Sequence, residues 1–333
     1  MTAGISDRRG GSAVTLPLRR RFSGLGSRWR SLFTIHIREA SFAARGFAPS
    51  DVVMRRRLEL VGEIFLAGFN RALVEDDGAA LAASVARIDP AHRGFAVEGA
   101  AMGSAIADAL MLGGGRLRAW MARNDADYTY LAHVGAGWAL GRVPWRRSAI
   151  LKHRDPVHGW LVFDGLGFHD TYFHTSWILR GRRRVRSGYA ARVYDQGIGR
   201  ALWFVAGGNI ASTMDALRRF DADRHPDLWS GLGLALAYAG GASPHDLRRA
   251  TVAAGPFRAN LAQGAAFGAE AHARARYIPP HTREAVSLLT GRDAEAAVRL
   301  VRGSCAALPV AEAPAAPHYE AWRRDVRQML LDP

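Results

Sequence analysis

Acidic and imidazole side chains gather in one stretch of the sequence, between residues 153 and 174. Seven of these 22 positions are His or Asp: His153, Asp155, His158, Asp164, His169, Asp170 and His174. A histidine beside an aspartate suits general acid or base catalysis, because the carboxylate fixes the imidazole tautomer and tunes its pKa. Such a set can also bind a divalent metal, but without an HExxH motif it does not predict a metal site.

Four polar residues are our candidates for catalysis. His133 and Asp195 each stand two residues before a glycine at equivalent places in the sequence, and Asp164 and His169 belong to the polar stretch itself. If the elements that carry them wrap a common axis, these four side chains converge there. The sequence leaves the alternative open that each forms a structural hydrogen bond between tightly packed helices.

The elements that carry these residues recur along the chain. Asp89-Pro90 and Asp155-Pro156 are 66 residues apart, and the glycines at positions 99, 165 and 231 keep the same interval. Each of these glycines is followed by a second glycine-centred segment, around positions 135, 197 and 264. The interval predicts three pseudo-repeats of about 66 residues, at 89–150, 155–207 and 226–276.

The local patterns predict helices for these elements. An Asp before a Pro, as at Asp155-Pro156, is an N-cap followed by a proline at the first helical position. Apolar residues then recur at intervals of three and four, so His158 and His169 are expected on one face of a single helix. We therefore predict a mostly α fold, in which three pseudo-repeats of paired helices follow an N-terminal helix.

The chain divides into three parts on this interpretation. Residues 1–40 form a basic segment that is partly disordered or amphipathic. Residues 41–304 form a single helical-repeat domain, whose N-terminal helix covers 51–75 behind a Ser50 cap. Residues 305–333 hold a linker rich in Ala and Pro and a short C-terminal helix at 318–330.

The recurring glycines do not predict a phosphate-binding loop. The stretch WLVFDGLGFHD lacks the third glycine of GxGxxG, since Asp170 stands there, and glycine pairs recur too often for one nucleotide site. A glycine inside a helix costs about 1 kcal/mol relative to alanine, so its recurrence implies a gain in packing. We expect these glycines to let helix backbones approach closely and to leave room for a central groove or tunnel.

The chain is strongly basic, with a formal charge of +15. Of its 45 basic residues only Lys152 is a lysine. This arginine bias, together with much Ala and Gly, is typical of a GC-rich genome, and no nucleic-acid-binding motif accompanies it. We therefore predict no nucleic-acid partner.

The first 40 residues raise the question of membrane contact. Phe22, Leu25 and Trp29 fall on one helical face among arginines, which is the pattern of a helix lying on a membrane surface. A disordered tail, or a helix docked on the body, explains the same residues. A single cysteine and the absence of any apolar run of about eighteen residues favour a cytoplasmic protein, with peripheral membrane association left open.

Several phrases together resemble a bacterial family of unknown function whose members occur beside enediyne polyketide synthases and related polyene clusters. They are RGFAVEGAAMG, HVGAGWAL, LVFDGLGFHDTYF, DQGIGRALWFV, LWSGLGLALAYAGG and LAQGAAFGAEA, and they cover roughly residues 36 to 300. The resemblance implies a role in enediyne or polyene biosynthesis. It assigns no catalytic residue and no cofactor, so the cofactor is unknown.

The resemblance and the helical pattern suggest one ligand, a polyketide-derived polyene. A long apolar polyene needs a groove lined by aliphatic and aromatic side chains. We expect that groove to be lined by Trp138, Phe168, Tyr172, Trp203 and Trp229. The protein would bind the polyene and process it, or alternatively act without catalysis as a scaffold or carrier that joins other biosynthetic proteins in a membrane-associated complex.

Overall fold

The structure is a computed structural model that describes residues 30–110, 114–152, 155–308 and 317–331. These residues form sixteen α-helices, α2 to α17, joined by short 3-10 helices, and contain no β-strand. The predicted mostly α fold is therefore confirmed. Its division into three pseudo-repeats of paired helices stays a prediction.

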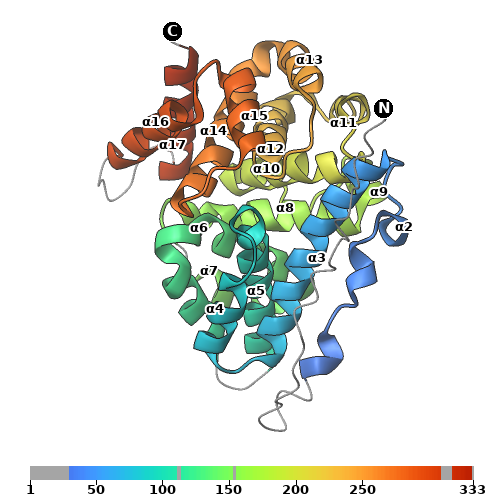
Figure 1. Ribbon diagram of the computed structural model, residues 1–333, viewed down its shortest axis with the longest axis vertical. Coiled ribbons are helices and arrows are strands. Elements are labelled where there is room, and N and C mark those ends of the chain that lie inside the picture. The colour runs from blue at the N-terminus through green and yellow to red at the C-terminus, as the bar shows by residue number, and fades with distance from the viewer. Residues whose placement is uncertain (1–29, 111–113, 153–154, 309–316, 332–333) are drawn as a thin grey trace, which may run out of the picture.

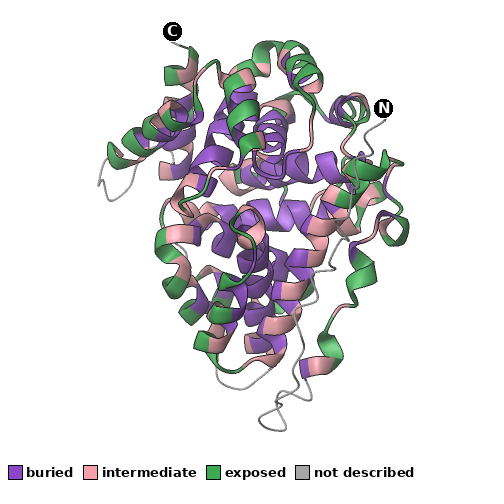
Figure 2. Ribbon diagram, viewed as in Figure 1, coloured by how far each residue is buried: buried purple, intermediate pink, exposed green. Residues whose placement is uncertain are grey.

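Seven long helices build the core (Figure 1). Each packs against the next in chain order, and most buried residues lie on them (Figure 2). The series of helices turns back on itself, so that its first helix meets the end of its sixth. Arg57 Nε on the first core helix donates to the carbonyl of Ala239, just past the sixth, at 3.0 Å. The core helices are α3 (Val52–Val74), α5 (Pro90–Leu110), α6 (Arg116–Arg142), α8 (Leu161–Phe173), α10 (Gly188–Val205), α12 (His225–Tyr238) and α14 (Arg258–Arg274).

Shorter helices connect and cover the core. Those between core helices are α4 (Gly78–Ala86), α7 (Arg147–Leu151), α9 (Thr175–Ile178), α11 (Ile210–Leu217) and α13 (Pro244–Ala254). The C-terminal region adds α15 (Pro280–Thr290), α16 (Ala294–Ala306) and α17 (His318–Leu331), and α2 (Phe42–Arg45) precedes the core. The 3-10 helices are η1 (Ser31–Phe33), η2 (Ile37–Ala40), η3 (Pro144–Arg146), η4 (His158–Trp160), η5 (Ala222–Arg224) and η6 (Gly255–Phe257).

Most of the predicted helices begin and end close to the residues predicted. The N-terminal helix is α3, although its cap is Asp51 rather than Ser50, since the Asp51 carboxylate accepts from the backbone of Val53 and Met54. The predicted C-terminal helix is α17, which packs on α14 through buried Tyr319 and Trp322. The amphipathic pattern of Phe22, Leu25 and Trp29 lies outside the described residues.

The helix expected after Asp155-Pro156 begins later than predicted. Asp155 does cap a turn, accepting from the backbone of Val157 and His158 at 2.8 and 2.7 Å. A 3-10 turn follows, and α8 begins only at Leu161. His158 therefore shares no helix with His169, and its ring meets Tyr130 and Trp322 instead.

Paired glycines set the spacing of the core helices. In α6, α8, α10 and α12, two glycines stand two residues apart, which places them about 200° apart around the helix. In α8, a Cβ at Gly165 would lie 1.9 Å from a carbonyl oxygen of α6, and one at Gly167 would lie 2.0 Å from a carbonyl oxygen of α10. The first glycine of each pair thus touches the preceding core helix, and the second touches the following one. Close packing of backbones is confirmed as the role of these glycines.

Across the residues that the structure describes, no helix has the length and apolarity that crossing a bilayer requires.

We predict that Gly197→Ala destabilises the fold strongly. A Cβ there would meet the carbonyl oxygen of Asp164 at 1.9 Å, so α8 and α10 would have to separate. We expect the free energy of unfolding to fall by about 3 kcal/mol, as for a severely overpacked core. Urea denaturation measures this loss.

Gly303→Ala is the matched control. Gly303 lies on the exposed side of α16, and no atom stands within 4 Å of a Cβ added there. Alanine is the better helix former, so this variant should gain up to about 1 kcal/mol. Equal stability of the two variants would contradict the packing role of Gly197.

Candidate functional site

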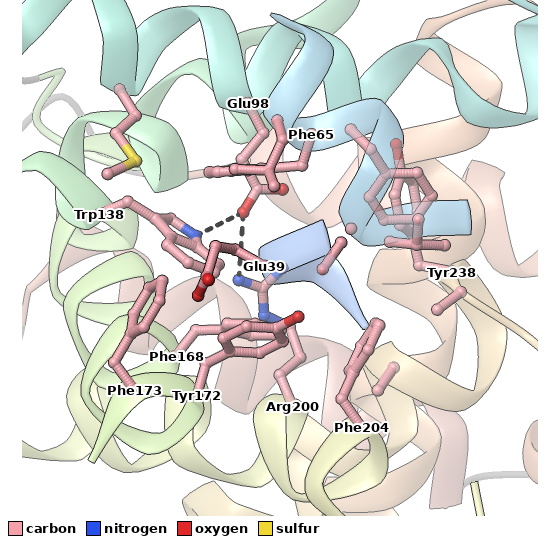
Figure 3. Close-up of a pocket in the computed structure, with 18 of the residues that line it drawn as sticks. Glu39, Phe65, Glu98, Trp138, Phe168, Tyr172, Phe173, Arg200, Phe204 and Tyr238 are labelled. Carbon is pink, nitrogen blue, oxygen red and sulfur yellow. Dashed lines mark hydrogen bonds and ion pairs between the residues drawn. The ribbon is translucent and has the colours of Figure 1, made fainter. Parts of the chain in front are cut away.

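An apolar cavity lies among the core helices (Figure 3). It encloses about 60 Å³, and α3, α5, α6, α8, α10 and α12 all contribute to its wall. That space holds roughly four to six water-sized groups. Most of the lining is aromatic, from Phe65, Phe95, Trp138, Phe168, Tyr172, Phe173, Phe204 and Tyr238.

Residues 30–46, here called the N-terminal strap, close the cavity on one side. Ile35, Glu39 and Ala40 belong to the cavity wall. The side chain of Asn70 on α3 holds the strap through two hydrogen bonds: Ile35 N–H donates to its Oδ1 at 2.8 Å, and its Nδ2 donates to Ile35 O at 2.7 Å. A second attachment joins the Phe42 backbone N–H to the Glu59 carboxylate at 3.0 Å.

Two of the residues that the core helices place in the apolar wall are charged, and Glu39 on the strap is a third. Glu98 on α5 and Arg200 on α10 point toward each other, with Arg200 Nη2 3.9 Å from Glu98 Oε1 (Figure 3). The indole N–H of Trp138 on α6 donates to the same Glu98 oxygen at 2.8 Å. Three core helices therefore place one carboxyl group, one guanidinium and one indole N–H donor at the cavity.

The Glu98 carboxyl is poised to exchange a proton near neutral pH. Its burial raises its pKa from 4.5 to about 7, against the opposing effects of Arg200 and the Trp138 hydrogen bond. Charged and neutral forms of Glu98 are both populated at physiological pH. A carboxyl group with this pKa suits general acid or base catalysis.

Arg200 lies between this cavity and a second, smaller one. The second cavity encloses about 40 Å³, and both cavities are lined by Arg200, Leu234 and Tyr238. Arg200 Nη2 forms an ion pair with Asp164 at 2.8 Å, and its guanidinium lies over the ring of Phe168 at 4.8 Å. The buried Nε has no hydrogen-bond acceptor among the described residues.

The second cavity is closed by the C-terminal helix α17. Asp164 on its wall accepts from Gln196 Nε2 at 2.8 Å, and Gln196 lies 3.2 Å from the hydroxyl of Tyr319 on α17. Burial raises the pKa of the Asp164 carboxyl, while Arg200 and Gln196 favour its charged form. A continuous polar chain thus runs from Arg200 through Asp164 to the C-terminal helix.

A family model described as "Protein of unknown function (DUF1702)" matches residues 25–330. The chain belongs to this family. No curated protein and no solved structure matches it.

Of the four candidate catalytic residues in this DUF1702 protein, only Asp164 lies at a cavity. His133 is buried in α6, where its Nδ1 lies 2.8 Å from the carbonyl of Thr129. Asp195 is held by Arg224 and Arg183, with Nη2 of Arg224 2.6 Å from its Oδ1. Both Asp195 oxygens are thereby engaged in ion pairs.

The fourth candidate, His169, stands behind the cavity wall. Its Nδ1 lies 3.0 Å from Asp170 Oδ1, and Asp170 also accepts from the Tyr194 hydroxyl at 2.7 Å. The His169 ring contacts Trp138 and Phe173, which line the cavity, but His169 itself does not line it. Burial lowers the pKa of both His169 and His133, so both are neutral at physiological pH.

These contacts give each of the four residues partners of its own, and their convergence on one axis stays a prediction. No hydrogen bond or ion pair described here joins any two of His133, Asp164, His169 and Asp195. Each pairs with a separate neighbour.

Three of the five expected groove residues line the larger cavity: Trp138, Phe168 and Tyr172. Trp203 and Trp229 are buried but line neither cavity. The Trp203 indole instead donates to the carbonyl of Gly240 at 3.1 Å. Position on the helix, rather than residue type, separates the two groups.

Sequence analysis missed Glu98 and Arg200 as site residues. The signal lies in their spacing from the helix glycines: Glu98 precedes Gly99 by one residue, as Asp164 precedes Gly165. Arg200 follows Gly197 by three, as Phe168 follows Gly165. Positions four apart share a helix face, so these two places turn toward the same interior.

We predict that Glu98→Gln stabilises the protein as pH rises. The pKa of Glu98 is 4.5 in the unfolded chain and about 7 in the folded protein. Between these two pH values the unfolded chain therefore loses its proton while the folded protein keeps it. The free energy of unfolding therefore falls with rising pH across this window and then levels off. Glutamine avoids this loss, on the order of 3 kcal/mol, while its amide oxygen can still accept from Trp138.

Urea unfolding of wild type and E98Q over a series of pH values measures this difference. The gap between the two proteins should open from about pH 4.5 to about pH 7 and stay constant above it. A gap that does not change with pH would mean that Glu98 keeps an ordinary pKa in the folded state.

We predict that Asn70→Ala loosens the N-terminal strap. The change removes both hydrogen bonds to Ile35, so backbone amides of the strap should exchange with deuterium faster, while those of the core helices keep their protection. Asn124→Ala is the matched control, because it removes one side-chain hydrogen bond to the carbonyl of Trp120 on α6. Equal exchange of the strap in both variants would show that Asn70 does not hold it.

Proposed function

We propose that the protein binds an elongated, conjugated apolar molecule in the larger cavity, and that this molecule is a polyketide-derived polyene. The observation that carries the proposal is the wall of aromatic rings, contributed by six of the core helices, with one oppositely charged pair at Glu98 and Arg200. Flat rings around an apolar space suit a flat conjugated chain, and few polar groups are needed to orient it.

The ligand reaches this cavity only when the strap moves. The space of about 60 Å³ holds only roughly four to six water-sized groups. Apart from Ala239, just past α12, the lining residues that no core helix supplies are Ile35, Glu39 and Ala40. Displacement of the strap from α3 would therefore open and enlarge the cavity without disturbing the glycine contacts between helices.

Glu98 is the residue that we propose for chemistry on the bound chain. A carboxyl with a pKa of about 7 can donate a proton to one carbon of a polyene and accept one from another. Such a transfer shifts double bonds without any net oxidation or reduction. The His and Asp candidates from the sequence, other than Asp164, do not line either cavity and play no part in this step.

The biological setting that we propose is enediyne or polyene biosynthesis, beside the iterative polyketide synthase and other biosynthetic proteins. This part rests on the resemblance of the quoted phrases to proteins of such clusters. We also propose that the core arose as three pseudo-repeats of paired helices, because glycine-centred helices recur at near-constant intervals in the sequence.

Diphenylhexatriene, a conjugated triene that fluoresces in apolar surroundings, tests the binding function. We predict saturable binding by the wild type and at least about tenfold weaker binding by Val61→Phe, because Val61 lines the cavity and the larger ring fills it. Val252→Phe is the matched control, since Val252 is exposed on α13. Absence of saturable binding to the wild type, or equal loss in both variants, would refute the proposal.

A further inference from the structure

Arg200 is an unusual group to find at the junction of two apolar cavities. Its guanidinium is buried, with Asp164 2.8 Å from Nη2 on one side and Glu98 at the limit of ion pairing, 3.9 Å from the same nitrogen, on the other. Its Nε has no acceptor among the described residues. A buried donor without an acceptor is costly to leave unsatisfied, so this end of the cavity is built to receive an acceptor.

We infer that the larger cavity recognises one end of its apolar ligand through an acceptor oxygen, a carbonyl or a carboxylate, which Arg200 binds while Glu98 is protonated. The inference rests on the proposed binding function and adds the chemistry of the end group. It assigns Arg200 to recognition and gives Glu98 a second role, as a donor that depends on pH.

The chemistry of arginine decides which end group is bound. The guanidinium carries only donors, so it satisfies an oxygen acceptor and offers nothing to a hydrocarbon end or an ammonium group. The remaining wall is aromatic and aliphatic and suits the rest of the chain. An unsaturated aldehyde, ketone, ester or acid therefore fits the cavity better than the hydrocarbon of the same length.

The groups around Glu98 explain why its proton is needed. Besides Arg200 and Trp138, the titratable side chains that act on Glu98 or share its cavity are Asp164 on α8, Tyr238 on α12, Tyr172 on α8 and Glu39 on the strap. None of these four is a cation. A charged Glu98 would repel an incoming oxygen and compete with it for Arg200.

Protonation of Glu98 removes that competition and supplies an O–H donor. The same oxygen of the ligand can then accept from both Arg200 and Glu98, as charge-assisted recognition of an oxygen often requires. Burial brings the pKa of Glu98 to about 7, which makes this proton available under ordinary conditions.

Displacement of diphenylhexatriene by three matched ligands tests the end group on the wild-type protein. Decatetraene, decatetraenal and decatetraenoic acid share one conjugated chain and differ only at the end. We expect the aldehyde and the acid to displace the probe at least about tenfold more tightly than the hydrocarbon at about pH 6. Equal displacement by all three overturns the inference but leaves the binding function standing, whereas failure of the probe to bind refutes the binding function itself.

The role of Glu98 is tested by the pH dependence of the same displacement. Binding of decatetraenal, which has no charge of its own, should weaken about thirtyfold between about pH 6 and about pH 8.5, since one proton must stay on Glu98. Glu98→Gln carries an amide donor at every pH, so it should bind decatetraenal almost equally at both values. A wild type without pH dependence, or an E98Q protein that keeps it, overturns the inference.

Arg200→Lys separates recognition from charge. Lysine can still pair with Asp164 but lacks the Nε donor, so the preference for the aldehyde over the hydrocarbon should fall at least about fivefold. Circular dichroism confirms that the variant is folded, and the comparison of ligands on the wild type remains decisive if it is not. A folded R200K protein with the full preference would show that Arg200 does not bind the oxygen.

Discussion

Direct contact between the backbones of consecutive helices is the constraint on which this structure depends. At each crossing a glycine of one helix meets a carbonyl oxygen of the next, and a single methyl group in that place would force the helices apart. Because a helix fixed at such a point cannot rotate, the positions on either side of the glycine have fixed directions.

The residue before the first glycine and the third residue after it face the interior in all six core helices from α5 to α14. The first set is Glu98, Val134, Asp164, Gln196, Ser230 and Gln263, and the second is Met102, Trp138, Phe168, Arg200, Leu234 and Phe267.

These two sets differ in chemistry. The second set lines the two cavities and is apolar except for Arg200. The first set is polar except for Val134, and its members bond to neighbours across the helices, as in the 3.0 Å hydrogen bond from Ser230 to Gln263. Buried charges are costly without partners. Arg200 and Arg323 are such partners for the buried carboxylates, and Nη2 of Arg323 on the C-terminal helix lies 2.7 Å from Asp227 Oδ1. The polar chain thus gives the packed helices a place where charge is tolerated, and the cavities open beside it.

The sequence predicted the helices well because their signals are local. An Asp-Pro pair at Asp89-Pro90 starts α5 where expected, and the glycine-centred segments are all helical. The predicted start of α8 was wrong because Asp155 caps a 3-10 turn, and the choice between that turn and a helix depends on packing against Tyr130 and Trp322.

Site residues were harder to predict, since the density of polar residues along the chain says little about their convergence in space. His169 and Asp164 are five residues apart but face different neighbours, whereas Glu98 and Arg200 are about a hundred residues apart and meet.

The strap offers the proposed ligand a route into the closed interior. Glycine contacts make the core helices poor candidates for movement, because their separation would break backbone packing at every crossing. The strap differs in kind: it buries Ala40 and Phe42 but exposes Leu32 and Ile37 to solvent, and its hydrogen bonds with Asn70, Glu59 and the Leu73 carbonyl hold it on α3. A segment that leaves large apolar side chains outside gains less from burial than the core does, and such segments open first. Since the strap also forms a part of the cavity wall that no core helix supplies, its detachment exposes the aromatic wall and the Glu98–Arg200 pair together. On this proposal the contacts of the strap with α3 set access to the cavity, while the glycines beneath it set the shape of the site.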